Sequence, residues 1–379
     1  MEIPRLTADS AMQRRRFVQL ALGSGTAAAL AGCGLQSGSP GAASSGKATY
    51  PPLSKENKNM TVIDFAGDNI KSLLPSYAAK YGLPKYTFTT SDANTLAMLK
   101  IGQKADVSIA YGIVGQLVDL GLIIPWDTSL IPNFGQLYPS FVSAGTLNGK
   151  QYLMPSQWGF ESAVYRPDIV TAPDSYEVLF DEKYAGKIAW LDNPLVEPAI
   201  AGILHGFPDP FNMTDAQLST IKKFLISKKH LVKLLWVNST DLEAAFKAGD
   251  IYVGHAWPSS WATLQGGKHP VGYLKPKTNE VAWSGGYILL KSTTHYHHAH
   301  EFINSVISPE AQLWAVKNFL QGPTSSKVSL SSVSPSVVKA FDLSDPAAIK
   351  LPAVLPEPKN ISASTYQRYG AMWNEFKAA

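Results

Sequence analysis

Polar side chains that could bind a ligand follow three successive apolar segments of the sequence. Gly67, Asp68 and Asn69 come directly after the first segment, Asp92 after the second and Tyr111 after the third. Open α/β sheets bind ligands outside the carboxyl ends of their strands, so these residues are expected near one sheet edge. Two plainer interpretations stay open: an ordinary turn at Asp68, and capping of the next helix by Asp92.

Aromatic side chains add a second chemistry. The chain holds nine tryptophans among 379 residues. An aromatic face packs alkyl chains and attracts cations, worth ~0.5–2 kcal/mol per contact. A desolvated ammonium also needs a carboxylate partner. Tryptophans together with acids would therefore suit an organic cation, and core or hinge packing is the alternative for each tryptophan.

Several other chemistries lack the residues they need. Cys33 is the one cysteine, which excludes a disulfide framework and a cysteine-built metal cluster. The sequence has no phosphate-binding loop and no nucleophile elbow between a strand and a helix. The histidines at 295, 297, 298 and 300 are clustered, but a solvated helix start is favoured over a metal site. We expect no cofactor and no metal.

Charge is weak and nearly balanced. The formal net charge is +4, with 16% charged and 45% hydrophobic residues. This composition is that of a globular protein without the strongly basic surface that nucleic-acid binding requires. Beyond the N-terminal segment the arginines are Arg166, expected to face a surface carboxylate, and Arg368. Arginine is the usual partner of carboxylate and phosphate ligands, so an anionic ligand is disfavoured.

Residues 1–32 carry the parts of an export signal. Arg14-Arg15-Arg16-Phe17 precedes an apolar run that ends in Leu30-Ala31-Gly32-Cys33. The run has about 14 residues, too few to span a bilayer comfortably. The arginines resemble a twin-arginine leader and the last four residues a bacterial lipobox. These resemblances imply export, lipidation of Cys33 and a periplasmic location at the outer face of the cytoplasmic membrane.

The segment that follows is rich in Gly, Ser, Ala and Pro. Residues 33–58 show no apolar periodicity, so they are expected to form a flexible tether. No later stretch approaches 18 apolar residues, and none is expected to span a membrane. A cytoplasmic protein with an apolar N-terminal helix is the alternative.

Strand and helix patterns alternate through the rest of the chain. Strands are expected at 61–65, 105–110, 187–191 and 251–256. Thr214 and Gln217 form a capping box, Thr240 and Glu243 begin another helix, and Ser308 before Pro309 caps a third. The alternation predicts an α/β sheet architecture.

Several local motifs occur in a particular order. They are Lys104-Ala105-Asp106-Val107 with Leu120-Gly121-Leu122-Ile123, Tyr152 to Gly159, Phe246 to Ile251 with Ala256-Trp257, Trp283 to Leu290, Ala299 to Asn304, and Ser308-Pro309-Glu310. Together they span about 59–326. Their joint order resembles bacterial ABC-transporter extracellular solute-binding proteins, most closely the spermidine/putrescine-binding subfamily.

This resemblance implies an α/β, type II-like periplasmic-binding-protein fold with two lobes. Two crossover strands, near 155–159 and 282–286, would join the lobes. The first lobe would comprise 59–156 plus 284–326, and the second 157–283 plus 327–379. The ligand would lie in the cleft between them, which closes by hinge motion.

The resemblance also implies candidate binding residues. Trp158, Trp257 and Trp283 would form aromatic walls, while an acid of the polyamine-binding pattern falls on Gly285. Other acids would have to replace it, each with a surface role as its alternative. The expected ligand-binding residues are Asp68, Asn69, Asp92, Tyr111, Trp158, Glu161, Asp192, Glu197, Trp257 and Trp283.

The function expected on these grounds is that of a lipoprotein, not an enzyme, which binds a solute for an ABC importer. It would capture a small organic amine, putrescine before spermidine, and deliver it as a monomer to a permease with its ATPase. A binding protein for a sugar, an amino acid derivative or a phosphonate is the alternative. An exported enzyme and a surface scaffold are further alternatives.

Overall fold

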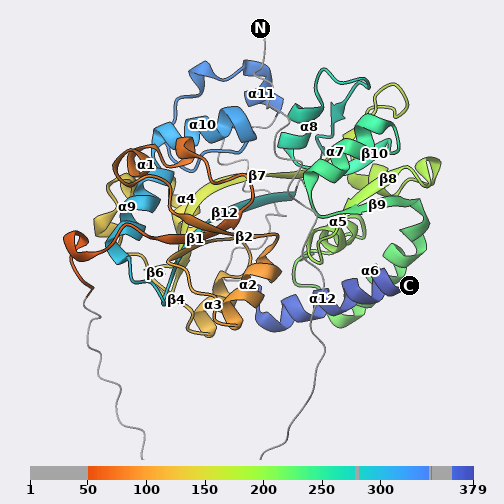
Figure 1. Ribbon diagram of the computed structural model, residues 1–379. Coiled ribbons are helices and arrows are strands. Elements are labelled where there is room, and N and C mark those ends of the chain that lie inside the picture. The colour runs from red at the N-terminus through yellow and green to blue at the C-terminus, as the bar shows by residue number, and fades with distance from the viewer. Residues whose placement is uncertain (1–49, 278–280, 341–342, 344–360) are drawn as a thin grey trace, which may run out of the picture. The chain divides into compact units, whose positions relative to one another are not determined.

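The computed structural model describes residues 50–277, 281–340, 343 and 361–379 (Figure 1). The expected export signal, Cys33 and residues 34–49 of the expected tether lie outside these ranges. Residues 50–58, predicted as the last part of the tether, contact the folded body instead, since Tyr50 stacks on Tyr296 at 3.8 Å. The buried carboxylate of Glu56 accepts hydrogen bonds from the backbone of His297 and His298. Residues 50–58 are thus part of the folded body.

In the described residues, ten strands form one sheet whose main path is β2-β1-β3-β12-β7-β10-β8-β9. Their bounds are β1 (Thr61–Phe65), β2 (Lys85–Thr89), β3 (Val107–Ala110), β4 (Ile123–Ile124), β7 (Leu153–Tyr165), β8 (Ile188–Leu191), β9 (Val232–Trp236), β10 (Val253–Ala256), β11 (Gly272–Tyr273) and β12 (Val281–Leu290). A separate hairpin pairs β5 (Thr146–Leu147) with β6 (Lys150–Gln151).

The two ends of this path are parallel sheets, and the two long strands between them are antiparallel. β1 pairs in parallel with β2 and β3, and β8 pairs in parallel with β9 and β10. β12 is antiparallel to both β3 and β7, and β7 to β10. We call the part built on β2-β1-β3 the first lobe and the part built on β10-β8-β9 the second. Figure 1 shows β7 and β12 running side by side from one lobe to the other.

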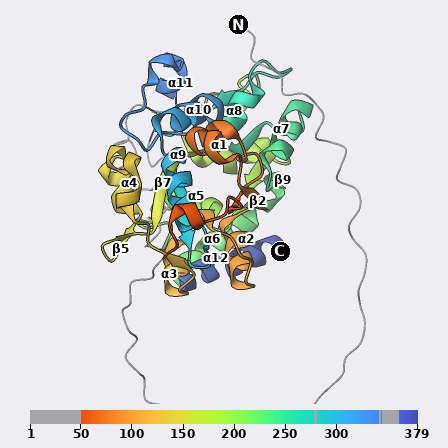
Figure 2. The same ribbon diagram turned by 60° about the vertical axis from the view of Figure 1, so that its left-hand side comes forward.

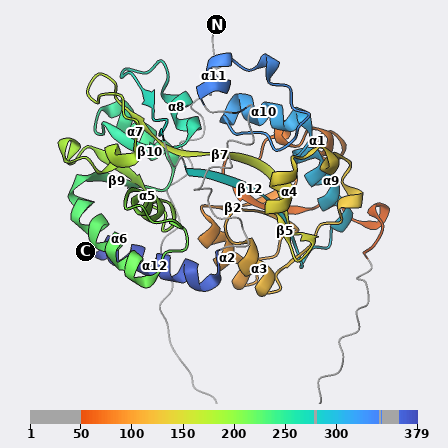
Figure 3. The same cartoon turned by 180° about the vertical axis from the view of Figure 1, so that it is seen from behind.

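Helices cover both lobes, as the turned views show (Figures 2 and 3). Those after first-lobe strands are α1 (Pro75–Tyr81), α2 (Asp92–Lys100), α3 (Val114–Asp119), α4 (Pro139–Ala144), α9 (Tyr296–Val306) and α10 (Pro309–Phe319). The others are α5 (Val196–Leu204), α6 (Asp215–Lys228), α7 (Ser239–Ala248), α8 (Pro258–Leu264), α11 (Pro335–Ala340) and α12 (Ala363–Ala378). No described helix is long and apolar enough to cross a membrane.

Helix caps follow the sequence signals at two of three positions. The Thr214–Gln217 capping box is present at α6, and Ser308 caps α10. The helix expected to begin at Thr240 begins at Ser239 instead, because Asn238 is the extended residue before it. The predicted partner of Arg166 is also confirmed, since its guanidinium pairs with Asp168 at 2.6 Å.

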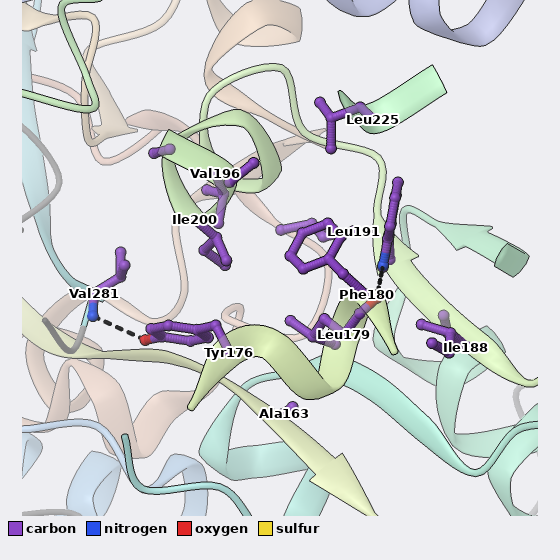
Figure 4. Close-up of a cluster of buried hydrophobic side chains, with 14 of the residues drawn as sticks. Ala163, Tyr176, Leu179, Phe180, Ile188, Leu191, Val196, Ile200, Leu225 and Val281 are labelled. Carbon is purple, nitrogen blue, oxygen red and sulfur yellow. Dashed lines mark hydrogen bonds between the residues drawn. The ribbon is translucent and has the colours of Figure 1, made fainter. Parts of the chain in front are cut away.

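A buried cluster in the second lobe fixes the two long strands to each other (Figure 4). Tyr176 belongs to this cluster and is 1% exposed. Its hydroxyl donates to the carbonyl of Glu161 on β7 at 2.7 Å and accepts from the amide of Val281 on β12 at 2.9 Å. One phenol therefore holds both strands at Glu161 and Val281, the last residue pair of the β7–β12 ladder.

The C-terminal helix α12 contacts both lobes. Tyr369, Trp373 and Phe376 are buried in the second-lobe core, and α12 packs along α6. Tyr366 packs against cores of both lobes, and Ile361, just before the helix, lies next to Gly112 after β3. Several later side chains pack with α10, Trp261 and Tyr273, namely Leu330, Val333, Val337, Val338 and Leu343.

Candidate functional site

The face shared by β7 and β12 forms the floor of the candidate site. Side chains alternate along a strand, so Gln157, Gly159 and Glu161 lie on one face of β7. Their partners on β12 are Gly285, Trp283 and Val281. A Cβ at Gly159 would come within 2.7 Å of the Trp283 ring. Glycine at this position therefore lets the indole lie on the strand between Gln157 and Glu161.

The opposite face of the same strands is core, which corrects one prediction. Trp158 and Phe160 pack with Phe141 on that face, and Trp158 is 0% exposed. The indole N–H of Trp158 donates to the carbonyl of Pro323 at 2.9 Å. Because Trp158 differs by an odd number of residues from Glu161, one continuous strand cannot present both on one face. Trp158 is a packing residue and not a wall of the site.

At the second-lobe end, an imidazole lies between two carboxylates. His255 on β10 contacts Oε2 of Glu161 through Nε2 and Oε1 of Glu197 through Nδ1, both at 2.8 Å. All three side chains are buried. Burial disfavours a charged imidazole, but the carboxylates of Glu197 and Glu161 outweigh it and raise the pKa of His255 to about 10. One imidazolium between two carboxylates leaves one net negative charge.

Within this group, Glu161 and Trp257 are the residues beside the floor. The indole N–H of Trp257, after β10, donates to Oε2 of Glu161 at 2.8 Å. Trp257 is partly buried and packs edge-on against Trp236 at 4.9 Å. Glu197 lies behind His255 with 0% exposure, so the structure corrects its expected role from ligand contact to support of His255.

At the first-lobe end, two carboxyl groups lie together at the end of β1. Asp64 is buried and shares a hydrogen bond with Asp68. The hydroxyl of Tyr287 donates to Oδ2 of Asp64 at 2.7 Å. Burial, together with the neighbouring charge of Asp68, raises the pKa of Asp64 well above its usual range. Burial also raises the pKa of Asp68 to about 6. The raised pKa values favour a proton shared by the pair, with Asp68 the more readily ionised of the two.

Tyr111 joins the first-lobe acids to the floor. Its ring meets Trp283 edge-on at 5.8 Å, and its hydroxyl accepts from Nε2 of Gln157 at 2.5 Å. A Cβ at Gly285 would stand 2.1 Å from the Tyr111 ring. The position where the polyamine-binding pattern has an acid is therefore filled by this phenol. Burial and the charges of Asp68 and Asp64 raise the pKa of Tyr111, so it keeps its proton.

Asp92 lies behind Tyr111 rather than in front of it. Its carboxyl accepts from the amides of Gly112 at 2.7 Å and Tyr111 at 3.2 Å. Burial, partly offset by these bonds, raises its pKa to about 6. The N-cap of α2 is Ser91, so the alternative of capping by Asp92 is wrong. Asn69 is exposed at the turn after β1, and its role stays a prediction.

Asp192 is held by the C-terminal helix, which corrects the prediction that it contacts the ligand. Its Oδ1 accepts from the indole N–H of Trp373 at 2.6 Å and from Lys377 at 3.1 Å. Both partners lie on α12, so this carboxylate fastens the C-terminal helix to the end of β8. Asp192 is a structural acid rather than a ligand-binding one.

The clustered histidines also have structural partners. His295 contacts Asp106 at 3.0 Å and Asn57 at 2.9 Å, while His297 contacts Glu56 at 3.1 Å. These contacts hold residues 56–57 against the start of α9. Among the described residues, no group of three or more histidine, cysteine or acidic side chains could hold a metal ion.

Sequence reasoning missed four residues of the site: Asp64, Gln157, His255 and Tyr287. Two of them carried a readable signal, because Asp64 and His255 are ionisable residues inside short apolar strands. A buried charge needs a partner, so each should have prompted a search for one. Gln157 and Tyr287 have no such signal, since their partners come from distant segments.

Two lobes of parallel sheet, joined by two long strands whose shared face carries Trp283 and Glu161, with further acids from each lobe, define a two-lobe binding protein. The family of bacterial extracellular solute-binding proteins matches residues 83–342. The chain belongs to this family, which confirms the resemblance seen in the sequence. Its members bind solutes outside the cytoplasm and are not enzymes.

Individual relatives agree on the fold. The spermidine/putrescine-binding periplasmic protein 1 of Haemophilus influenzae is 24% identical over 199 residues, 51% of this chain and 54% of the relative. The match thus spans about half of that curated relative. The substrate-binding protein PotD of a spermidine/putrescine ABC transporter from Streptococcus pneumoniae is 17% identical, with a TM-score of 0.65 over 84% of this chain and 98% of that one. The TpPotD lipoprotein of Treponema pallidum is 15% identical, with a TM-score of 0.67 over 84% and 98%. These structures confirm the two-lobe periplasmic-binding-protein fold.

Proposed function

We propose that this chain is the solute-binding component of an ABC importer and that it binds a small organic amine against Trp283. The observation that carries the proposal is the position of this indole between two acidic groups from different lobes. Asp64 with Asp68 lies at one end and Glu161 with His255 and Glu197 at the other. Each group keeps one net negative charge.

The electrostatics favour a cation over other solutes. Charges in a poorly solvated site need partners, and the protein supplies the second lobe with one imidazolium for two carboxylates. An ammonium would neutralise the remaining charge at either end. Its alkyl chain would lie on the indole, with an aromatic contribution of ~0.5–2 kcal/mol. Gln157 and Glu161, at the two ends of the floor, are about 13 Å apart along the strand, which leaves room for a diamine.

Binding requires the two lobes to separate first. Trp283 is 8% and Glu161 4% exposed, so solvent reaches little of either side chain. A hinge at β7 and β12, the two strands that cross between the lobes, would open the floor and close it over the solute. In this proposal Trp257 covers Glu161, and Tyr111 covers the opposite end.

The relatives support the same class of ligand and its delivery. Two are named for spermidine and putrescine, and one of these is a component of an ABC transporter. The third is called a lipoprotein. We propose that Cys33 carries a lipid after twin-arginine export, and that the protein acts as a monomer. It would hand its solute to a membrane permease driven by an ATPase, and it needs no cofactor.

Thermal unfolding with a panel of solutes tests the proposal. A ligand that binds only the folded state adds about 2.7 kcal/mol at one hundred times its Kd. We expect the melting temperature to rise with putrescine and less with spermidine, but not with glucose, glutamate or 2-aminoethylphosphonate. Stabilisation by one of the latter solutes, with none by putrescine or spermidine, would contradict the amine proposal. Glu161→Gln should abolish the rise, whereas the exposed Asp119→Asn should not.

A further inference from the structure

One polar atom of the site floor has no partner. Trp283 is more than nine-tenths buried, and among the described residues its indole Nε1 finds no hydrogen-bond acceptor. Its neighbours explain why. The ring lies over Gly159, which offers no side chain, and meets the Tyr111 ring edge-on. The indoles of Trp158 and Trp257, in contrast, donate to a carbonyl and a carboxylate.

A second donor lies beside this indole. The hydrogen bond from Gln157 uses the oxygen of Tyr111 as its acceptor, so the phenolic hydrogen stays available. The acids Asp68, Asp64 and Asp92 all favour the protonated phenol. Tyr111 and Trp283 are in edge contact at 5.8 Å. Two donors therefore share one wall, between the acidic groups of the two lobes.

A diamine without an oxygen atom would leave these two donors without a hydrogen-bond acceptor. Its ammonium groups can face the acids, but its carbon chain offers the indole N–H no lone pair. A buried donor without an acceptor keeps its full desolvation cost. An oxygen on the chain between the amines would accept from Trp283, Tyr111 or both.

The charge of that oxygen is constrained by the surroundings. Carboxyl groups lie at both ends of the floor, and Asp92 lies behind Tyr111. A carboxylate oxygen on the ligand would meet like charges, whereas a hydroxyl or an amide oxygen would not.

We propose that the solute is an amine bearing an uncharged oxygen acceptor between its ends, a hydroxyl or an amide, which receives the Trp283 N–H. This inference rests on the proposed function and narrows its ligand class. Trp283 is then a specificity-determining residue through its nitrogen as well as through its ring.

Isothermal titration with a matched pair of diamines tests the inference. Putrescine and 1,4-diaminobutan-2-ol share length and charge and differ by one hydroxyl. We expect the hydroxylated diamine to bind at least tenfold more tightly. In Trp283→Phe, which keeps an aromatic ring but lacks the N–H, the two affinities should come within about twofold. Trp314→Phe on α10, away from the floor, should keep the preference. 4-Aminobutanoate should bind more weakly than either diamine.

The outcomes distinguish the oxygen-acceptor inference from the broader proposal that the protein binds an amine. Equal or tighter binding of putrescine by the unaltered protein overturns the oxygen acceptor and leaves the amine function standing. A preference that persists in Trp283→Phe also overturns it, because the N–H is then not responsible. Tyr111→Phe gives a second test if Trp283→Phe does not fold, and should weaken the preference. Failure of both diamines to bind overturns this inference together with the proposed function.

Discussion

The two acidic groups of the site relieve the repulsion between neighbouring carboxylates in different ways. Each lobe brings together two acids that repel each other. In the first lobe Asp64 and Asp68 share a proton, whereas in the second Glu161 and Glu197 share the imidazolium of His255. A shared proton leaves as the pH rises, but an imidazolium with a pKa of about 10 stays charged through the neutral range. In the folded protein, the charge of the first group should therefore change as the pH passes about 6, the pKa of Asp68, whereas the charge of the second group should stay constant through the neutral range.

Removal of the shared cation should have the largest effect. His255→Gln leaves Glu161 and Glu197 buried without a positive partner, and breaking such an arrangement costs about 3–5 kcal/mol. Urea unfolding at pH 7.5 should show a loss of that size. His230→Gln, at an exposed histidine that pairs with Glu182, should change stability by about 0.5 kcal/mol or less. A loss below about 1 kcal/mol for His255→Gln would mean that the imidazolium is not needed.

The pH profile of that loss has a definite sign. The pKa of His255 is raised from 6.5 to about 10 in the folded protein. Its charged form therefore stabilises the fold fully below about pH 6.5, and the contribution disappears as the pH rises through about 10. The stability difference between wild type and His255→Gln should shrink over that range. A difference that grows with pH would contradict the assignment.

Neutralising one acid of the first-lobe pair should stabilise the protein, whereas removing the imidazolium of His255 should destabilise it. The pKa of Asp64 is raised on folding, so its contribution is favourable at low pH and is lost as the pH rises. Asp64→Asn cannot ionise but can still donate to Asp68. We expect it to raise stability at pH 8 by about 1 kcal/mol or more, with a smaller gain at pH 5. Equal effects at both values in thermal unfolding would show that the pair does not share a proton.

The smallest effect should come from Asp192, which was predicted to bind the ligand but contacts α12 in the structure. Asp192→Asn loses its charge interaction with Lys377 but keeps an oxygen for the indole of Trp373. We expect a loss of about 0.5–1 kcal/mol in unfolding free energy and putrescine affinity within twofold of wild type. A tenfold loss of affinity would return Asp192 to the binding site.

These differences also show what the sequence could and could not reveal. The α/β class followed from the alternation of strand and helix patterns, and the two crossover strands followed from the resemblance to solute-binding proteins. The error at Trp158 was avoidable in principle. The resemblance placed a crossover strand near 155–159, whereas β7 is one strand from Leu153 to Tyr165. Side-chain alternation along one strand places Trp158 and Glu161 on opposite faces.

The contacts of these acids could not be predicted from the sequence. Glu161, Glu197 and His255 come together only because β10 pairs with β7 in a register that sets His255 opposite Ala163. Asp192 is drawn away by Trp373, nearly two hundred residues later, through the docking of α12. Side-chain type identified candidate ligands, but long-range pairing decided which acids are held by the protein and which remain for a solute.

The central claim is that acids from both lobes bind one cationic solute against Trp283. Isothermal titration of putrescine at pH 7.5 into wild type, Asp68→Asn, Glu161→Gln and the double variant tests it most directly. We expect each single change to weaken putrescine binding at least tenfold and Asp192→Asn to leave it unchanged. Lowering the pH through about 6, the pKa of Asp68, should weaken binding by the wild type but not by Asp68→Asn. Affinities within twofold of wild type for both single variants would contradict the account.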